Sequence, residues 1–349
     1  MELDNIKYKL LIMKLDLFDY ELPKKLIAQK QIKPRDNSRL LVIDKKTKKL
    51  KDDFFYNLDK YLDENDVLIF NNSKVFPARI RLENTGEMFL LQDSGRGKWE
   101  VIGKKLRFKI YDLRFKDILL KCEIVKRLPN GNWLAKFNLS GKNFRQVLDK
   151  IGETPLPPYI KVKDSKKIRE NYQTIYATKD GSVAAPTAGF HFTKRLFDKL
   201  SRKGVKCEFV TLHVGLGTFQ PVKTNKIEDH KMHAEYVVLD KKTTQRLNNY
   251  KKQGKRIVAV GTTSCRVLEA MSNQKGQLRA GSKWVDIFIY PPYRFKFIDG
   301  LITNFHLPKS TLLMLVSALV GRKFILQVYQ HAIKKKYRFY SFGDGMLIQ

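Results

Sequence analysis

On both sides of residues 81–149 the chain combines apolar segments with amphipathic ones, and this alternation limits the possible folds more than any other feature. Buried strands are predicted for RLLVID (39–44), DVLIF (66–70), KCEFVTLHV (206–214), KRIVAV (255–260), VDIFIY (285–290) and LITNF (301–305). Helices are predicted for residues 22–29, TKRLFDKLSRKG (193–204), SCRVLEAM (264–271) and STLLMLVSALVG (310–321). Strands that alternate with helices predict an α/β sheet with largely parallel strands.

A different pattern interrupts this alternation between residues 81 and 149. Short alternating segments such as MFLLQ, KWEVIG, LRFKIY and NWLAKFNL are separated by SGRG and PNG turns. Such spacing is typical of a small antiparallel β-barrel or sandwich. We therefore predict a β domain inserted at 81–149 into an α/β catalytic domain made of 13–80 and 150–349, with the proline-dense GETPLPPY (152–159) marking the return.

The charge of the chain indicates a polyanionic partner. It carries 68 Lys and Arg against 35 Asp and Glu, a formal net charge of +33. Nucleic acid is the first candidate for such a partner, although lysines on a solvated surface would also account for the charge.

Other features of the sequence exclude several classes of protein. Cys122, Cys207 and Cys265 are far apart, without a CxxC pair, which argues against a disulfide framework or a thiolate metal site and fits a reducing cytoplasm. No apolar run reaches the length of a membrane span, and the N-terminus lacks the features of a signal peptide. Neither GxGxxG nor GxxxxGK[ST] is present, so neither a dinucleotide-binding fold nor a P-loop enzyme is indicated.

Four loops with unusual residues follow predicted strands or precede predicted helices: APTAGFHF, HVGLGTF, VGTTS and NFHLPKST. In an open α/β sheet, ligands bind outside the carboxyl ends of the strands, so these loops are expected to build one cleft. Five of the six histidines are found in these loops or near them, namely His191, His213, His230, His233 and His306. A structural role in the core or on the surface is the alternative for each of them, and it is the favoured role for His331.

A zinc site and a nucleophile are the alternative chemistries at these loops. His230 and His233, together with His213, could form a zinc site, but the HExxH helix is missing, and orientation of a substrate with Glu235 as acceptor is favoured. Ser264 and Cys265 lack the surroundings of a nucleophile. The glycines Gly215, Gly217 and Gly261 allow a ligand to approach the backbone closely, and Gly261 precedes a helix N-terminus suited to an anion.

Aromatic and basic residues alternate in FIYPPYRFKF (288–297) and KKKYRFYSFGD (334–344). Such mixtures suit unstacked RNA bases, because rings stack on the bases while basic groups hold phosphates. Core packing explains Phe339 and Phe342 equally well. Tyr293 and Arg294 are therefore the better candidates for contacts with RNA.

Taken in order, the motifs APTAGFHFT, TLHVGLGTFQPV, HKMHAEY, VGTTSCRVLEA, NFHLPKSTLLMLVSALVG and YSFGDGMLI closely resemble the S-adenosylmethionine:tRNA ribosyltransferase-isomerases of queuosine biosynthesis. FDYELPKKLIAQ, FNNSKVFPARI and GETPLPPYI extend the resemblance over nearly everything from Met13 onward. Residues 86–150 resemble the family only loosely. Residues 1–12 precede the usual family start and are interpreted as an N-terminal extension.

The resemblance implies an enzyme that transfers and isomerises the ribosyl part of S-adenosylmethionine onto 7-aminomethyl-7-deazaguanine (preQ1) at the tRNA wobble position. The implied products are epoxyqueuosine in tRNA, adenine and methionine. S-adenosylmethionine is then a consumed substrate, and neither a metal nor a bound cofactor is expected. The implied partners are this tRNA and S-adenosylmethionine, without a membrane, and we expect a cytoplasmic monomer.

This chemistry needs a base, an acid for the departing adenine and a place for the sulfonium cation. Imidazole titrates near neutrality, so His191, His213, His233 and His306 are the predicted catalytic residues. Phe190, Phe192 or Phe219 could hold the sulfonium, and Thr262, Thr263, Ser264 or Arg266 the methionine carboxylate. The full set of predicted substrate-binding residues is Ala188, Gly189, Phe190, Gly215, Gly217, Thr218, Phe219, His230, Glu235, Gly261, Thr262, Thr263, Ser264, Arg266, Tyr293 and Asn304.

Two alternative functions remain at this point. An S-adenosylmethionine-dependent tRNA methyltransferase would also combine this substrate with a basic surface, but it would release S-adenosylhomocysteine. A non-catalytic RNA-binding protein would explain the charge and the aromatic residues but leave the loop histidines without a purpose. Release of free adenine distinguishes the ribosyltransferase from both.

Overall fold

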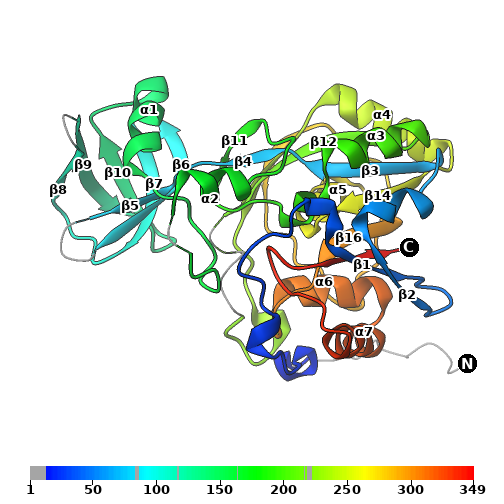
Figure 1. Cartoon of the computed structure of the whole chain (residues 1–349). Coiled ribbons are helices and arrows are strands. Elements are labelled where there is room, and N and C mark those ends of the chain that lie inside the picture. Colours follow the sequence, from blue (N-terminus) through cyan, green and yellow to red (C-terminus); the bar gives the residue numbers. More distant parts are fainter. Residues whose placement is uncertain (1–12, 83–85, 116–117, 163, 216, 218–221) are drawn as a thin grey trace, which may run out of the picture.

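The computed structural model describes residues 13–82, 86–115, 118–162, 164–215, 217 and 222–349. It contains a nine-stranded mixed sheet, a six-stranded antiparallel sheet and a two-stranded ribbon between them (Figure 1). The predicted N-terminal extension, residues 1–12, lies outside the described residues. The proposed domain boundaries themselves stay a prediction.

The nine-stranded sheet has the order β15-β13-β12-β3-β14-β16-β17-β1-β2. Its strands are β1 (Arg39–Ile43), β2 (Leu50–Phe54), β3 (Asp66–Asn71), β12 (Lys206–His213), β13 (Glu235–Leu239), β14 (Arg256–Val260), β15 (Gly281–Val285), β16 (Gly300–Asn304) and β17 (Gly345–Ile348). The run β12-β3-β14-β16 is parallel, as is the pair of β17 and β1. The other four pairings are antiparallel. The prediction of a largely parallel sheet therefore holds for the centre only.

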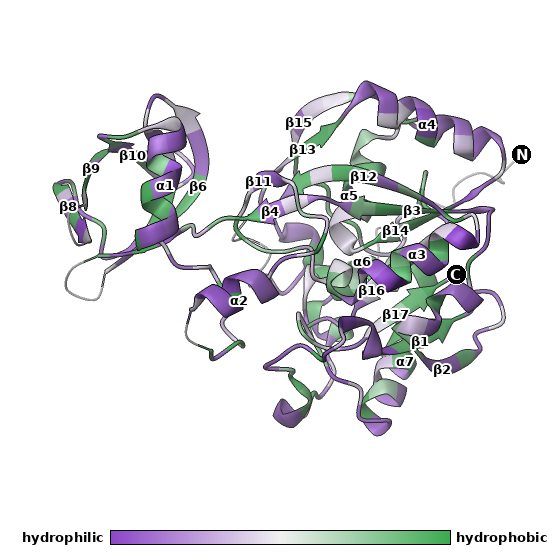
Figure 2. Ribbon diagram, turned by 45° about the horizontal axis from the view of Figure 1, so that its top comes forward, coloured by the Kyte–Doolittle hydropathy of each residue, from purple (hydrophilic) through white to green (hydrophobic). Residues whose placement is uncertain are grey.

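Helices cover both faces of this sheet, because alternate residues of each strand point to opposite sides. On one face Ile69, Ile257 and Ala259 pack against α5 (Thr262–Met271), α6 (Thr311–Val320) and α7 (Arg322–Lys334), and α4 (Lys241–Lys252) joins the same core. On the other face Phe70 and Val258 pack against α3 (Lys194–Arg202) and the 3₁₀ turn η4 (Phe55–Lys60). Figure 2 shows hydrophobic strands at the centre of this sheet and predominantly polar residues on α3 and α4.

The six-stranded sheet has the order β5-β6-β7-β10-β9-β8 and is antiparallel throughout. Its strands are β5 (Arg79–Arg81), β6 (Glu87–Gly95), β7 (Lys98–Lys104), β8 (Ile110–Phe115), β9 (Ile118–Arg127) and β10 (Trp133–Phe137). Helix α1 (Gly141–Ile151), which the sequence analysis did not predict, packs Phe144 and Leu148 into the core of this sheet. The ribbon of β4 (Ser73–Val75) and β11 (Lys179–Ser182) connects this part with the large sheet, and α2 (Lys166–Asn171) follows α1 along the chain (Figure 1).

Most predicted elements of the α/β part form within a residue or two of their expected limits. Thr193 caps α3 by accepting a hydrogen bond from the Leu196 N–H, and Ser310 caps α6 in the same way through Leu313. Two predictions were wrong. The strand expected at 285–290 forms earlier, at Gly281–Val285 (β15), because these residues pair with β13. The helix expected at 22–29 shrinks to the 3₁₀ turn η2 (Lys24–Leu26), because Ile27 forms a β-bridge with Phe339.

The remaining 3₁₀ turns are η1 (Leu15–Phe18), η3 (Arg35–Asn37), η5 (Thr187–His191) and η7 (Ile227–Asp229). Across the described ranges, no single helix is long and apolar enough to cross a membrane. Helices α6 and α7 pass the same criteria only as a pair, and they meet at an angle of 112°.

Candidate active site

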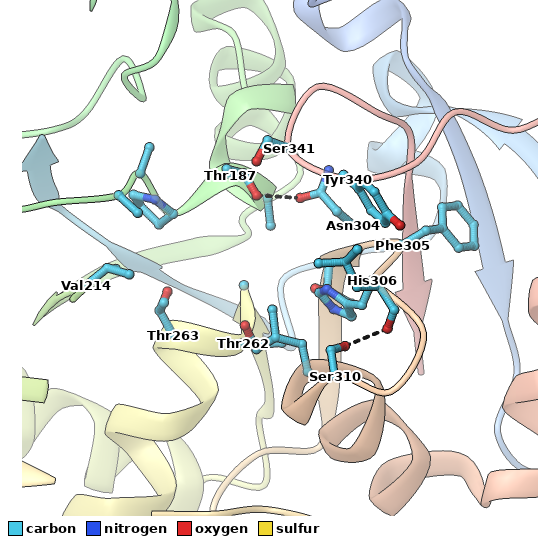
Figure 3. Close-up of a pocket in the computed structure, with 18 of the residues that line it drawn as sticks. Thr187, Val214, Thr262, Thr263, Asn304, Phe305, His306, Ser310, Tyr340 and Ser341 are labelled. Atoms are coloured by element: carbon cyan, nitrogen blue, oxygen red, sulfur yellow. Dashed lines mark hydrogen bonds between the residues drawn. The ribbon is translucent and has the colours of Figure 1, made fainter. Parts of the chain in front are cut away.

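One candidate site is a cavity of about 500 Å³ beyond the carboxyl ends of β14 and β16, which we call the nucleoside cavity after the ligand expected from the sequence. Its walls are four segments distant in sequence: 184–188, 261–263, 303–312 and 340–341, with Pro158, Tyr159, Tyr172 and Val214 completing them. Figure 3 shows Thr187, Thr263, Asn304 and His306 arranged around this space. Three of the four loops predicted to form one cleft therefore meet here, and the fourth contributes Val214.

Two helix N-termini border the nucleoside cavity. Gly261, with φ of 89°, follows β14 directly and is the N-cap of α5, so Thr262 and Thr263 are the first two residues of this helix. At α6, the N-cap Ser310 and the first helical residue Thr311 line the cavity. The first turn of a helix has N–H groups without helical partners and a positive dipole end, which favours an anion. No Asp or Glu is among the described residues that line the cavity, and the Thr263 hydroxyl is buried with no partner in the described part of the chain.

An aromatic pair closes another side of the nucleoside cavity. The rings of Tyr159 and Tyr340 lie 4.7 Å apart between centroids, and the Tyr159 hydroxyl is 2.7 Å from Ser341 Oγ. Tyr340 has φ of 71°, an uncommon conformation for a residue with a side chain, of the kind found at functional sites. Neither tyrosine was among the predicted site residues. The signal was present in two of the family motifs, GETPLPPYI and YSFGDGMLI.

His306 is the histidine that lines the nucleoside cavity. Its Nε2 lies 3.0 Å from the Thr303 hydroxyl, its backbone N–H donates to the Tyr329 hydroxyl, and its carbonyl accepts from Tyr20. Burial lowers the pKa of His306 to about 3, because the charged imidazolium loses its hydration. The ring is therefore neutral near pH 7 and able to accept a proton or a hydrogen bond.

His191, by contrast, is held in the core behind the cavity wall. Its ring stacks on Phe55 at 4.0 Å, and Ser38 Oγ lies 2.6 Å from Nδ1. Asn304 donates to Nε2 at 3.2 Å and accepts from Thr187 on its other side (Figure 3). With Nε2 accepting, Nδ1 carries the proton. Burial, and then the positive charges of Arg338 and Arg35, lower the pKa of His191 to about 3, so it fixes Asn304 as a neutral ring.

A second cavity, of about 480 Å³, lies between the two large sheets, and we call it the interdomain cavity. The six-stranded sheet and its loops contribute Leu91, Gln92, Glu100, Ile102, Asn130 and Asn132, and the other part of the chain contributes Gly181, His213, Val214, Gly215, Gly217, Met232, His233, Ala234, Tyr236 and Trp284. Val214 lines both cavities, so the two spaces are neighbours.

Two of the predicted catalytic histidines, His213 and His233, belong to the interdomain cavity rather than to the first. The Nδ1 atom of His213 is buried and finds no partner among the described residues. Burial, and then the charge of Arg145, lower the pKa of His213, against the opposing effect of Asp180. Gly217 packs closely on His233, since a Cβ there would lie 2.5 Å from the ring.

Other predicted site residues lie outside both cavities. Arg266 and Glu235 form a buried ion pair, and Glu235 also accepts the Gly215 N–H at 3.1 Å, which ties α5 to β13. The Ser264 hydroxyl of α5 donates to the Val260 carbonyl at the end of β14.

The aromatic candidates among the predicted site residues lie mainly in packed surroundings. Phe190 packs with Tyr172 and Phe342 in one cluster of the core. Phe192 is buried in another cluster, against Phe55 and Phe70, and Gly189 lies against the Tyr176 hydroxyl. His230 packs edge-on against Phe288, and burial, followed by His233, lowers the pKa of His230. Thr218 and Phe219 lie outside the described residues.

Glu269, which the sequence analysis did not single out, organises the segment that carries Tyr293. This fully buried carboxylate accepts hydrogen bonds from the Tyr293 hydroxyl and from three backbone N–H groups, those of Lys296, Phe297 and Ile298. The polar end of Tyr293 is therefore occupied by the protein itself, while Arg294 is exposed. In the described part of the chain, no group of three or more His, Cys, Asp or Glu side chains could hold a metal ion.

Comparison with known proteins gives one consistent result. Residues 15–348 match the family model of queuosine biosynthesis proteins. Two relatives named S-adenosylmethionine:tRNA ribosyltransferase-isomerase, from Thermoanaerobacter sp. (strain X514) and Desulfitobacterium hafniense (strain DSM 10664 / DCB-2), are 49% and 48% identical, each over 96% of this chain and 100% of its own length. The crystal structure of an S-adenosylmethionine tRNA ribosyltransferase from Thermotoga maritima matches 95% of this chain and 100% of its own, with 33% identity and a TM-score of 0.55.

Proposed function

This chain belongs to the queuosine biosynthesis family, and we propose that, like the S-adenosylmethionine:tRNA ribosyltransferase-isomerases it resembles, it transfers and isomerises the ribosyl group of S-adenosylmethionine onto preQ1 at the wobble position of tRNA. The products are epoxyqueuosine in tRNA, adenine and methionine. S-adenosylmethionine is consumed, and the reaction needs no metal or resident cofactor.

The observation that carries the proposal is the nucleoside cavity, which we assign to S-adenosylmethionine. Its volume of about 500 Å³ is within the range of small-molecule sites. The methionine carboxylate is expected at the N-terminus of α5, where Thr262 and the unpartnered hydroxyl of Thr263 lie and no carboxylate side chain opposes it. This replaces Ser264 and Arg266, because neither lines the cavity, the Ser264 hydroxyl donates to Val260, and Arg266 is paired with Glu235.

The sulfonium and the adenosine need apolar and aromatic surroundings. Tyr159 and Tyr340 border the cavity, whereas Phe190 and Phe192 are packed in the core. A cation over such a ring gains roughly 0.5 to 2 kcal/mol. We therefore assign this contact to the tyrosine pair, with Ala188 leaving room for the nucleoside.

We assign proton transfer at S-adenosylmethionine to His306. It borders the cavity, and its imidazole is neutral in the substrate-free protein, so a ring nitrogen can take up the proton from the ribose carbon beside the sulfonium. The pKa of about 3 describes the ring without a substrate beside it, so the assignment rests on the position of His306. Asn304, fixed by His191, faces the same space and orients the substrate. His191, Glu235 and Arg266 are then positioning residues.

One incubation tests the proposal. The protein is mixed with S-adenosylmethionine and tRNA carrying preQ1, and the products are separated by liquid chromatography and mass spectrometry. The ribosyltransferase releases adenine and methionine only when this tRNA is present. Adenine release without tRNA, or S-adenosylhomocysteine as the product, would overturn the proposal.

The setting of the enzyme follows from the same chemistry. We place it in the reducing cytoplasm, where its tRNA substrate is found and where free cysteines are stable; the described structure leaves Cys122, Cys207 and Cys265 free. We expect a monomer, which light scattering during size-exclusion chromatography measures directly.

A further inference from the structure

We propose that the interdomain cavity is the pocket for the reacting base of the tRNA, with Glu100 accepting hydrogen bonds from the base and Trp284 stacking on it. This inference rests on the proposed function. It assigns the substrate pocket to residues of both large sheets, including a carboxylate of the inserted β region.

The position of the cavity supports this assignment first. The reacting base has to reach the ribose of S-adenosylmethionine, and Val214 is the residue shared by the walls of both cavities. Enzymes that modify a nucleobase take it out of its stack into a pocket. A volume of about 480 Å³ beside the nucleoside cavity provides that pocket.

The charge of the lining favours a base over a phosphate. The chain has 68 Lys and Arg, yet none is among the described residues that line the interdomain cavity. Its charged side chain is instead a carboxylate, Glu100. A carboxylate repels phosphate oxygens but attracts ammonium and N–H donors.

The hydrogen bonds of Glu100 leave it able to bind such donors. Asn130 and Asn132 both donate to Oε1, at 2.8 Å and 2.5 Å, and no donor in the described structure is assigned to Oε2. The two amides fix the carboxylate in place. Oε2 then matches the aminomethyl ammonium of preQ1, the cationic donor that guanine lacks.

Aromatic rings line the opposite wall. Trp284 is 47% exposed, an unusual state for so large a ring, and lies 5.3 Å from Tyr236, which in turn stacks parallel to His213 at 6.3 Å. Base stacking on such a ring tolerates any base and contributes strongly to binding of unpaired nucleotides. The cavity therefore combines an unspecific stacking surface with a specific acceptor.

The first test exchanges Glu100→Gln, which keeps the oxygen that the two asparagines need and removes the charge. Glu123→Gln is the matched control, because Glu123 is an exposed carboxylate on β9 of the same sheet and is not part of the cavity. For Glu100→Gln we expect the KM for preQ1-tRNA to rise at least tenfold and the KM for S-adenosylmethionine to stay unchanged. In equilibrium titrations, the preference in binding for preQ1-tRNA over tRNA with guanine at the wobble position should disappear. The control should match the wild type.

An unchanged preference in Glu100→Gln, with wild-type melting behaviour, would refute the role of Glu100. If both variants weaken or strengthen tRNA binding equally, the effect is one of net charge and the assignment is also refuted. If the wild type shows no tRNA-dependent adenine release, the proposed function fails instead, and the second test below still decides on the pocket.

The second test measures binding without turnover. An anticodon stem–loop with preQ1 is titrated into the protein, and the quenching of tryptophan emission is followed in the wild type and in Trp284→Phe and Trp284→Ala. We expect the quenching to be lost in both variants, with affinity nearly kept in Trp284→Phe and reduced roughly 5- to 150-fold in Trp284→Ala. Equal affinity and quenching in all three proteins would overturn the proposal.

Discussion

Replacing Glu269 by glutamine tests whether this buried carboxylate organises the segment 293–298. One oxygen accepts the Phe297 and Ile298 N–H groups at 3.0 Å and 3.1 Å, and the other accepts the Lys296 N–H at 2.8 Å and the Tyr293 hydroxyl at 3.0 Å. Glutamine keeps one oxygen. Its NH₂ group then faces two donors, of which the Tyr293 hydroxyl can turn and accept, but the Lys296 N–H cannot.

The expected cost follows from these bonds. A hydrogen bond to a charged group contributes about 1.5 to 3 kcal/mol, and a buried donor left without a partner costs about 1 to 3 kcal/mol. In Glu269→Gln the Lys296 N–H loses its acceptor, and the remaining hydrogen bonds go to a neutral oxygen. Together these losses predict a decrease of about 2 to 5 kcal/mol in the free energy of unfolding.

Chemical denaturation followed by circular dichroism measures this loss, with Glu123→Gln as the surface control. The control should change the free energy of unfolding by less than about 0.5 kcal/mol. A loss below about 1 kcal/mol in Glu269→Gln would show that the hydrogen-bond argument is wrong.

Four further outcomes are expected. His306→Gln should lower kcat by about 10²- to 10⁴-fold with a folded protein, and full turnover would remove His306 from the chemistry. Thr263→Val should raise the KM for S-adenosylmethionine severalfold without lowering the melting temperature, because a hydroxyl that has no partner in the described structure is removed; an unchanged KM would contradict its role. His191 and His306 have folded pKa values of about 3, below the ordinary value of 6.5, so the unfolded state binds more protons between these pH values. The free energy of unfolding should therefore fall by up to about 1.4 kcal/mol per pH unit for each histidine as the pH drops through this window. His191→Gln should make this decline less steep in unfolding titrations. Binding of tRNA should weaken with salt by about 0.7 to 0.9 in log affinity per log salt for each phosphate contact, and a flat dependence would mean that the surplus lysines do not bind the tRNA.

The centre of the fold could be predicted because its signals are local. The strands β3, β12, β14 and β16 are short apolar runs that end at turns or loops, and such runs are recognisable without knowing their neighbours. The antiparallel pairing at the edges was not predictable in the same way, because it depends on which segments lie side by side. The segment after Val285 shows the limit: it is apolar like a strand, but it packs partly buried against the core without pairing.

The site could be predicted at the level of loops but not of individual side chains. The family motifs located the walls of both cavities, since the loops around His306, Thr263 and Val214 do converge. They could not show that His191 lies against Asn304 in the core while His306 faces the cavity. Successive positions of an irregular loop point in different directions, so the motif does not fix the direction of each side chain. The pairing of Tyr159 with Tyr340 joins segments distant in sequence, so only the structure reveals it.

Val214 has a consequence for the design of inhibitors. Its N–H donates to the Ser182 hydroxyl and its carbonyl accepts from the Val183 N–H. These two hydrogen bonds fix the backbone of Val214 at the boundary of the two cavities. A compound that joins an adenosine part to a deazaguanine part would need a linker that passes this one side chain. Val214→Ala would widen the passage and should strengthen binding of such a two-part compound while leaving each separate part nearly unaffected.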